Sequence, residues 1–341
     1  MEFLKINGEF GEGGGQIIRT AITLSCITKR SVIIENIRKN RKIPGLRPQH
    51  LTAIKILQKI CNVDVEGAKI GSTNLKFIPG NVKSCNLIED VGTAGSISLI
   101  LQVLISVAAI CQKKMNLTIK GGTDTLWSPT IDYTQYVLRE AYSRMGIKFS
   151  MKLIKRGYYP KGGGEINLEV LPSNVKSITL YQRKTRNVKL FCSFSNLPNE
   201  LIKRNVENIE KKLTGKKFVV QTQINEEIAI DSGATLLICS IDDESIIGVD
   251  SVFDKKTEQF NLDLESFTEN NYGVDDRLAD MLVLPACLTN EMTIFRVKNI
   301  SKHLETNLFV ASKITGCKYG VGKLGDGFEI RIEGISYTSI K

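Results

Sequence analysis

The 341-residue sequence predicts an α/β fold built from layers of helices and sheets. Apolar segments with helical spacing alternate with short segments rich in β-branched and aromatic residues. A similar unit, which opens with a glycine turn and continues into an apolar helix, recurs three times. The composition, with 42% hydrophobic and 24% charged residues, is that of an ordinary globular protein, and the length suits about two domains.

The first unit opens with the glycine turn at residues 11–15, which leads into an apolar helix that reaches Ser25. A β-branched strand is expected at residues 31–37. A second, amphipathic helix is predicted over Pro48–Cys61, because its apolar residues recur at helical spacing and proline is favoured in a first turn.

The second unit opens with a segment at 91–111 that is apolar on all sides, which predicts a fully buried helix. Its remaining elements are a strand at 115–119, a helix at 130–145 and a strand at 164–170.

The third unit opens with an apolar helical segment at 272–288. A second helix is expected from near His303 to Ile314, ended by Gly316, since glycine is the usual residue just after a helix. Strands are predicted at 293–297 and 328–332.

Residues 183–271 lack a glycine-triplet motif and are interpreted as a small α/β domain inserted between the second and third units. The larger, catalytic domain of three repeated units then comprises residues 1–182 and 272–341. The elements expected in the insertion are a strand at 188–194, a helix at 199–213, strands at 217–223, 234–240 and 244–250, and a polar loop at 255–271.

The chain carries 46 Lys and Arg against 36 Asp and Glu, a formal net charge of +10. This surplus favours a polyanionic partner, although a lysine-rich solvated surface explains it equally well. The longest apolar run, at 97–111, is too short to span a membrane, and the N-terminus lacks a signal-peptide pattern. We therefore expect a cytoplasmic protein with no membrane partner.

The eight cysteines form no CxxC pair, and the chain has only two histidines. This composition argues against a Cys/His zinc site and favours reduced thiols in the cytosol.

One histidine, His50, lies at the predicted start of the second helix. Arg38, Arg41 and Arg47 precede it, and Gln49 is its neighbour. Free N–H groups at a helix start and the forked guanidinium of arginine both bind phosphate. The stretch predicts a site for several phosphates; a solvated basic loop is an equal alternative.

The glycine turn at 13–15 lets the backbone approach a ligand, and Gln16 and Arg19 share one face of the helix that follows. The spacing matches neither a Walker A loop nor a dinucleotide-binding fingerprint, so a simple tight turn remains an alternative. Glu12 beside such an anion site is a candidate ligand for Mg²⁺ or Mn²⁺.

Together these residues resemble the RNA 3′-terminal phosphate cyclase family, in order along nearly the whole chain and least strongly across 183–271. The matching motifs are GEGGGQIIRT at 11–20, PGLRPQHLTA at 44–53, GTAGS at 92–96, GGTD at 121–124, GYYPKGGG at 157–164, LAD at 278–280 and HLETN at 303–307.

The resemblance implies an ATP-dependent reaction on an RNA that ends in a 3′-phosphate, with Mg²⁺ or Mn²⁺ as cofactor. A histidine, which falls on His303, takes AMP from ATP and passes it to the RNA 3′-phosphate. The neighbouring 2′-hydroxyl then closes a 2′,3′-cyclic phosphate. A neutral imidazole is the form such a nucleophile requires.

The resemblance also assigns three sets of site residues. The metal ligand is Glu12. The residues expected to bind phosphate and the RNA end are Arg19, Arg38, Arg41, Gln49 and His50. The residues expected to bind the nucleotide are Gln102, Pro129, Arg277, Leu278, Ala279, Asp280 and Met281.

Two positions depart from the family pattern. Arg277 occupies a position that is commonly aromatic or histidine, where it is expected to stack on the adenine opposite Pro129. Met281 replaces a common glutamine. The only tryptophan, Trp127, lies two residues before Pro129 and is expected to pack in the core, with an apolar wall beside the nucleotide as the alternative.

The hairpin residues Tyr158, Tyr159 and Lys161 are expected either to contact RNA or to serve a structural turn.

Two other functions fit parts of the pattern. A non-catalytic cyclase-like protein that binds RNA or assembles ribosomes would keep the fold and lose the nucleophile, and a carboxyvinyl-transferase-like enzyme would need no nucleotide bound to histidine. The presence of His303 and of the arginine set favours the cyclase, as a monomer or a dimer.

Overall fold

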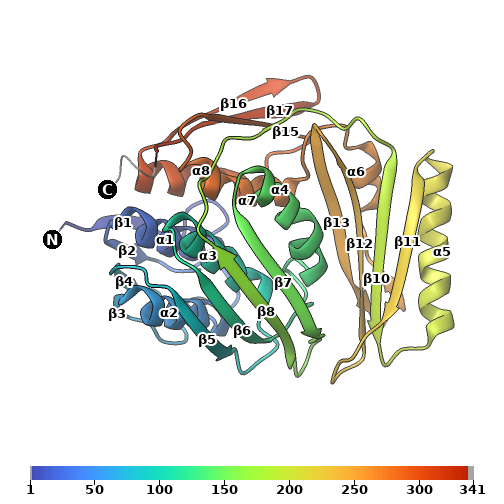
Figure 1. The fold of residues 1–341 in the computed structure, drawn as a ribbon, viewed down its shortest axis with the longest axis horizontal. Helices are drawn as coiled ribbons and strands as arrows, with labels where there is room; N and C mark the ends of the chain where they lie inside the picture. Colours follow the sequence, from blue (N-terminus) through green and yellow to red (C-terminus); the bar gives the residue numbers. More distant parts are fainter. Residues whose placement is uncertain (1, 337–341) are drawn as a thin grey trace.

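The computed structural model describes residues 2–336 and shows a mixed α/β fold with four sheets, which confirms the predicted fold class (Figure 1). The first sheet has the order β1-β2-β4-β3, with β1 and β2 parallel and the other pairs antiparallel. The elements of this region are β1 (Leu4–Asn7), α1 (Gly15–Thr28), β2 (Val32–Glu35), α2 (Pro48–Cys61), β3 (Asp64–Glu66) and β4 (Leu75–Ile78).

The second sheet repeats this arrangement in the order β5-β6-β8-β7, again with one parallel pair. Its elements are β5 (Cys85–Asp90), α3 (Ile97–Ile110), β6 (Met115–Gly121), η1 (Tyr133–Leu138), α4 (Arg139–Arg144), β7 (Lys148–Lys155) and β8 (Gly164–Leu171). Alternate residues of β6 are buried, so one face of this sheet covers the helices.

The third sheet has the equivalent order β9-β15-β17-β16, with β9 parallel to β15. The elements are β9 (Thr179–Leu180), α7 (Asp276–Ala286), β15 (Met292–Val297), α8 (Lys302–Thr315), β16 (Lys318–Leu324) and β17 (Gly327–Glu333). The predicted end of the last helix is confirmed, because Gly316 follows α8 with a left-handed φ of 84°.

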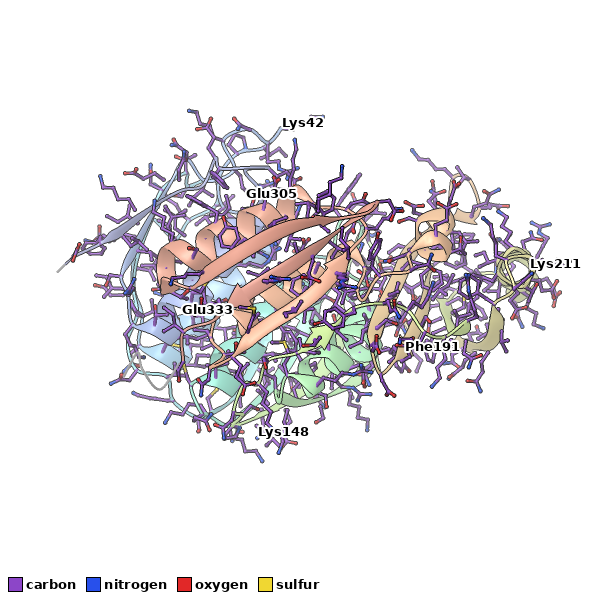
Figure 2. All side chains as sticks on the ribbon, turned by 90° about the horizontal axis from the view of Figure 1, so that it is seen from above. Lys42, Lys148, Phe191, Lys211, Glu305 and Glu333 are labelled. Carbon is purple, nitrogen blue, oxygen red and sulfur yellow. The ribbon has the colours of Figure 1, made fainter. Side chains whose placement is uncertain are left out.

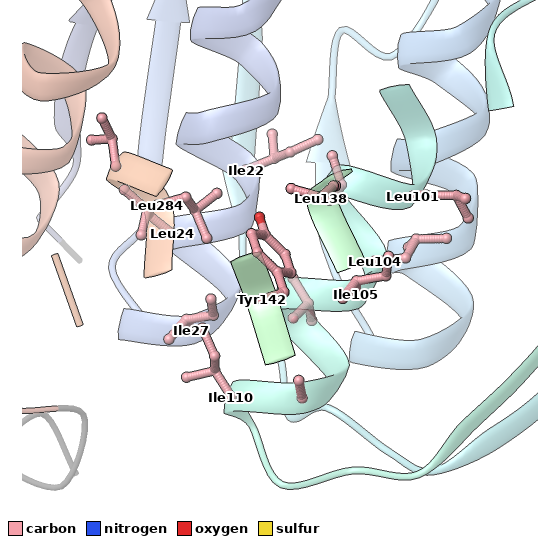
Figure 3. Packing of buried hydrophobic residues seen from close by; sticks show 14 of the residues in the cluster. Ile22, Leu24, Ile27, Leu101, Leu104, Ile105, Ile110, Leu138, Tyr142 and Leu284 are labelled. Carbon is pink, nitrogen blue, oxygen red and sulfur yellow. The ribbon is translucent and has the colours of Figure 1, made fainter. Parts of the chain in front are cut away.

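Helices α1, α3, α7 and α8 lie between these three sheets in Figure 1. Their apolar side chains form one continuous core. Figure 3 shows Ile22 of α1, Leu104 of α3, Tyr142 of α4 and Leu284 of α7 converging in it. As predicted, α3 is buried along almost its whole length. This packing fixes the relative positions of the helix starts that form the site described below.

The fourth sheet, in the order β11-β10-β12-β13-β14, has its own hydrophobic cluster and stands beside the others. Its elements are β10 (Asn187–Ser195), α5 (Asn199–Gly215), β11 (Val219–Glu226), β12 (Gly233–Asp242), β13 (Ser245–Asp254), β14 (Gln259–Phe260) and α6 (Leu264–Glu269). The expected polar loop at 255–271 is therefore wrong in part, because Phe260 and Phe267 pack into this cluster and form β14 and α6. Figure 2 shows Lys211 of α5 at the right-hand end of the molecule.

A buried guanidinium joins the second and fourth sheets. Arg156, 1% exposed, lies 3.1 Å from Asp124 and 2.9 Å from both Asp132 and Glu227. Its side chain also donates to Ser193 at 2.8 Å. Because the carboxylates come from different elements, Arg156 balances charges that would otherwise repel one another in a dry interior.

None of the helices in residues 2–336 combines the length and the apolar character needed to cross a membrane.

We predict that Arg156→Met lowers the free energy of unfolding by about 3–5 kcal/mol, because it leaves buried carboxylates without a counter-charge. The control is Lys114→Met, which breaks the exposed ion pair with Glu169 and should cost at most about 1 kcal/mol. Chemical denaturation measures both values. Equal losses in the two variants would show that the buried arginine has no special structural role.

Candidate active site

A cavity of about 1050 Å³ opens where five helices begin. Its wall includes Gly15 of α1, Gln49 of α2, Ser96 before α3, Asp276 of α7 and His303 of α8. The first N–H groups of a helix have no partner within the helix, and the helix dipole makes this end positive. The convergence of these helix starts favours an anionic ligand.

His303 is the second residue of α8 and contacts the glycine loop before α1. Its Nδ1 forms a hydrogen-bonded pair with Oε2 of Glu12. Partial burial lowers the pKa of His303 below its ordinary value; Glu12 raises it, while Arg19 and Arg41 lower it further. The imidazole is therefore neutral near pH 7, with its proton on Nδ1 and a lone pair on Nε2.

The loop that carries Glu12 is fitted closely to α8. Gly11 has a left-handed φ of 61°, and a Cβ at this position would overlap the hydroxyl of Thr306. Next to Thr306 in α8, the side-chain oxygen of Asn307 accepts a hydrogen bond from the hydroxyl of Thr20 in α1 at 2.7 Å. These contacts hold the glycine loop and α1 against α8 where Glu12 and His303 meet.

Five guanidinium groups line the cavity, and two of them, those of Arg41 and Arg277, have a carboxylate partner. Arg41 forms an ion pair with Glu12. Within the part of the chain that the structure describes, Arg19, Arg38 and Arg47 form no ion pair. Burial lowers the pKa of Arg19 to about 10, which leaves it charged at neutral pH. The cavity thus holds positive charge that phosphate oxygens would neutralise.

His50 is buried, 2% exposed, at the start of α2. Its Nδ1 accepts a hydrogen bond from the backbone N–H of Arg47 at 3.1 Å. Burial, together with the charges of Arg19, Arg38 and Arg47, lowers the pKa of His50 to about 3. The ring is neutral, and its Nε2–H faces Gly15, where a Cβ would overlap it. His50 therefore offers a fixed hydrogen-bond donor in the cavity.

The predicted nucleotide residues of α7 divide between two sides of the helix. Arg277, Asp280 and Met281 line the cavity, as do Gln102 of α3 and Pro129 after β6. The side chains of Leu278 and Ala279 do not, because both are 0% exposed in the hydrophobic core. At 3.6 residues per turn, a single face of α7 cannot contain all five consecutive positions.

Arg277, which was expected to stack on adenine, is held at the cavity wall by other groups. Its Nη1 pairs with Asp250 of β13, and the guanidinium lies 5.2 Å from the ring centre of Tyr133. Asp250 also accepts from the backbone N–H of Thr130 at 2.7 Å. Asp250 was not among the predicted site residues, since nothing in the local sequence pattern of β13 shows which residue the Asp250 side chain faces.

Asp280 connects α7 with the start of α8. Its Oδ1 accepts from Ser301 at 2.6 Å, and its backbone carbonyl accepts from Asn307 at 2.7 Å. Burial raises the pKa of Asp280 to about 8, with a further increase from Asp276 and Asp275; Ser301 and Arg277 act in the opposite sense. Asp280 is therefore protonated at neutral pH, and it helps to position the helix start that carries His303.

The expected core role of Trp127 is wrong. Its side chain is 99% exposed at the cavity mouth, because the loop between β6 and η1 directs it away from the interior. The hairpin tyrosines differ: Tyr158 is buried, whereas Tyr159 is 75% exposed and lines the cavity. Lys161 is exposed and forms a long ion pair with Asp231, 4.0 Å away.

The sequence is similar to known proteins along nearly its full length. The profile of the family described as RNA 3′-terminal phosphate cyclase matches residues 10–321. The RNA 3′-terminal phosphate cyclase of Methanosarcina barkeri is 36% identical over 335 residues, covering 96% of this chain and 99% of the relative. The proteins of the same name from Archaeoglobus fulgidus and Pyrobaculum aerophilum are 35% and 34% identical, covering 92% and 98% of this chain and 96% and 99% of the relatives.

We predict a pH-dependent effect of Asp280→Asn on stability. The pKa of Asp280 is about 8 in the folded protein and about 4 in the unfolded chain. Between these pH values the folded protein therefore binds one more proton than the unfolded chain. The stability of the original protein therefore falls as the pH rises through this range. Asparagine keeps the acceptor for Ser301 and cannot ionise. The melting temperature of the variant should therefore rise relative to that of the original protein as the pH increases from 4 to 8.

Thermal melts from pH 4 to 9 measure this difference, with Asp64→Asn on the exposed strand β3 as the control for loss of one carboxylate. A melting-temperature difference that stays constant over the range for Asp280→Asn would contradict the assignment of a protonated Asp280.

Proposed function

The chain belongs to the RNA 3′-terminal phosphate cyclase family, and from this premise we propose that it converts an RNA 3′-phosphate into a 2′,3′-cyclic phosphate at the expense of ATP. The observation that carries the proposal is the contact between Glu12 and His303 inside the arginine-lined cavity. This contact places a neutral nucleophile among arginines that can neutralise the charge of phosphate groups.

In the first step, Nε2 of His303 attacks the α-phosphorus of ATP. A nitrogen–phosphorus bond forms, the bond to the bridging oxygen breaks, and pyrophosphate leaves. Glu12 accepts the hydrogen bond from Nδ1–H and stabilises the positive charge that develops on the ring. Burial lowers the pKa of His303 below its ordinary value, which keeps the attacking nitrogen free of a proton before the reaction.

In the second step, an oxygen of the RNA 3′-phosphate attacks the phosphorus of the histidine-bound AMP. The nitrogen–phosphorus bond breaks, and the AMP is now joined to the RNA through a pyrophosphate linkage. In the third step, the 2′-hydroxyl oxygen attacks the RNA phosphorus and its proton passes to water. The bond from that phosphorus to the bridging oxygen of the pyrophosphate linkage breaks, and AMP leaves. Adenylylation is needed because a terminal phosphate lacks a good leaving group.

The arginines supply the electrostatic part of this chemistry. Arg19, Arg38 and Arg47 have no carboxylate partner among the described residues, so bound phosphates would provide their counter-charge. The Nε2–H of His50 adds a donor that does not change its protonation near neutral pH. These fixed groups stabilise charge on the phosphate oxygens without rearranging during the reaction.

A divalent cation, Mg²⁺ or Mn²⁺, would enter with the triphosphate. The described residues contain no group of three or more His, Cys, Asp or Glu side chains able to hold a metal, so phosphate oxygens would complete the ligand set. Glu12 fits as the carboxylate ligand. The amide oxygen of Gln16, which is buried without a hydrogen-bond partner at the cavity, fits beside it. The cation would neutralise charge on the phosphates.

We predict that incubation with ATP labelled at the α-phosphate leaves covalent label on the protein, and that His303→Ala abolishes it. His50→Ala is the comparison, because it removes a hydrogen-bond donor and leaves the nucleophile in place. It should slow cyclisation and still permit labelling. Denaturing gel electrophoresis measures the bound label, and adding RNA with a 3′-phosphate should discharge it.

Full labelling of His303→Ala would refute the assignment of His303 as the nucleophile. A folded, RNA-binding protein that takes up no label would instead be a non-catalytic member of the family. An RNA with hydroxyls at both ends is the control for discharge of the label, and it should leave the protein-bound AMP intact.

A further inference from the structure

Two large aromatic side chains stand at the cavity mouth in contact with water. Trp127 is 99% exposed and Tyr159 is 75% exposed, and both line the same cavity as His303. Isolated apolar residues on a surface are common, but two aromatic rings at the rim of a charged cavity indicate a surface for a ligand.

The backbone presents the tryptophan in this position. Trp127 has a φ of 66°, a left-handed conformation that is uncommon for a bulky residue and concentrates at functional sites. Thr125 and Ser128 bracket it, and their hydroxyls lie 2.8 Å apart. Its exposure therefore follows from a defined turn.

The tyrosine stands on a neighbouring support. The backbone N–H of Thr123, at the base of the tryptophan loop, donates to the carbonyl of Gly157 at 2.9 Å, at the base of the tyrosine hairpin. Next to Tyr159, the ring of Tyr158 is buried, and a Cβ at Gly233 would overlap it. The two loops are joined at their bases, so both rings belong to one rim.

This rim lies outside the region suited to the adenosine of ATP. Pro129 is buried, and Arg277, whose side chain is 40% exposed, is held against the wall by Asp250 and Tyr133, whereas the ring of Trp127 is 99% exposed. The cavity, at about 1050 Å³, is at the upper limit of the roughly 300–1,000 Å³ typical of one small-molecule site. The cavity therefore has room for a second bound ligand that extends out of it through the mouth.

We propose that Trp127 and Tyr159 form a stacking platform for the bases of single-stranded RNA next to the 3′-terminal phosphate. This inference rests on the proposed function, because it takes the terminal phosphate to lie among the arginines. The charge agrees with such a strand: Arg38 and Arg47 lie within the cavity without carboxylate partners among the described residues, and Lys161 is exposed beside Tyr159.

The platform has consequences for substrate choice. Every base has an aromatic face, so stacking selects single-stranded ends with little regard to sequence. A nucleoside 3′-phosphate, which has no upstream bases, should be a much poorer substrate than a short oligonucleotide. A 3′-end buried in a duplex should be poorer as well, since its bases are already stacked on one another.

The test uses the fluorescence of Trp127, the only tryptophan of the chain. An oligoribonucleotide with a 3′-phosphate should quench this fluorescence in the full-length protein, whereas ATP alone should not. Trp127→Ala and Tyr159→Ala should each raise KM for the oligoribonucleotide by about 5- to 100-fold, the range expected for loss of one stacked base. Trp127→Phe, which keeps a ring, should restore most of the loss.

Tyr319→Ala is the matched control, because Tyr319 is an exposed aromatic residue of β16 outside the cavity, and its KM for RNA should stay unchanged. Formation of covalent AMP without RNA is measured on the same variants. Its absence in the original protein would defeat the proposed function itself.

If Trp127→Ala and Tyr159→Ala form covalent AMP normally and their KM values for RNA are unchanged, the proposed stacking platform is wrong. Quenching by ATP alone, accompanied by a raised KM for ATP in Trp127→Ala, would overturn it in favour of a contact with the adenine.

Discussion

The contact between Glu12 and His303 is the interaction on which the site depends. It joins a loop near the beginning of the chain to a helix near its end, and it exists only because α1 packs against α8. The buried hydrogen bond between Thr20 and Asn307 connects the same two helices across 287 positions of sequence. The chemistry of the imidazole is therefore a consequence of packing between α1 and α8.

Electrostatics then determine what the cavity can hold. Three arginines without carboxylate partners in the described part of the chain, and five converging helix starts, make it positive. The same charges, together with burial, keep His50 and His303 neutral, and burial keeps a proton on Asp280. A site with fixed positive groups and uncharged imidazoles suits nucleophilic attack on phosphorus, since the nucleophile is free while the phosphates are neutralised.

The sequence predicted the features that depend on local chain signals. The glycine loop, the helix start at Pro48, the helix start near His303 and its end at Gly316 all follow from residues adjacent in sequence. The family motifs identified the candidate site residues, and most of these residues line one cavity. Their assigned roles stay predictions, as does the division into domains.

What sequence reasoning missed depends on contacts between distant elements. Asp250 reaches Arg277 of α7 from strand β13, and Arg156 gathers carboxylates from two distant segments, the connection between β6 and η1 and the residue after β11. The exposure of Trp127 was missed because tryptophan is usually largely buried, and only the backbone of its loop shows otherwise.

The most direct test of the central claim is to locate the nucleotide on the protein. The protein is incubated with ATP, kept at neutral or alkaline pH to preserve a nitrogen–phosphorus bond, digested and mapped by tandem mass spectrometry. The account predicts one AMP group on the imidazole of His303. AMP attached to a lysine or to His50 instead would contradict it.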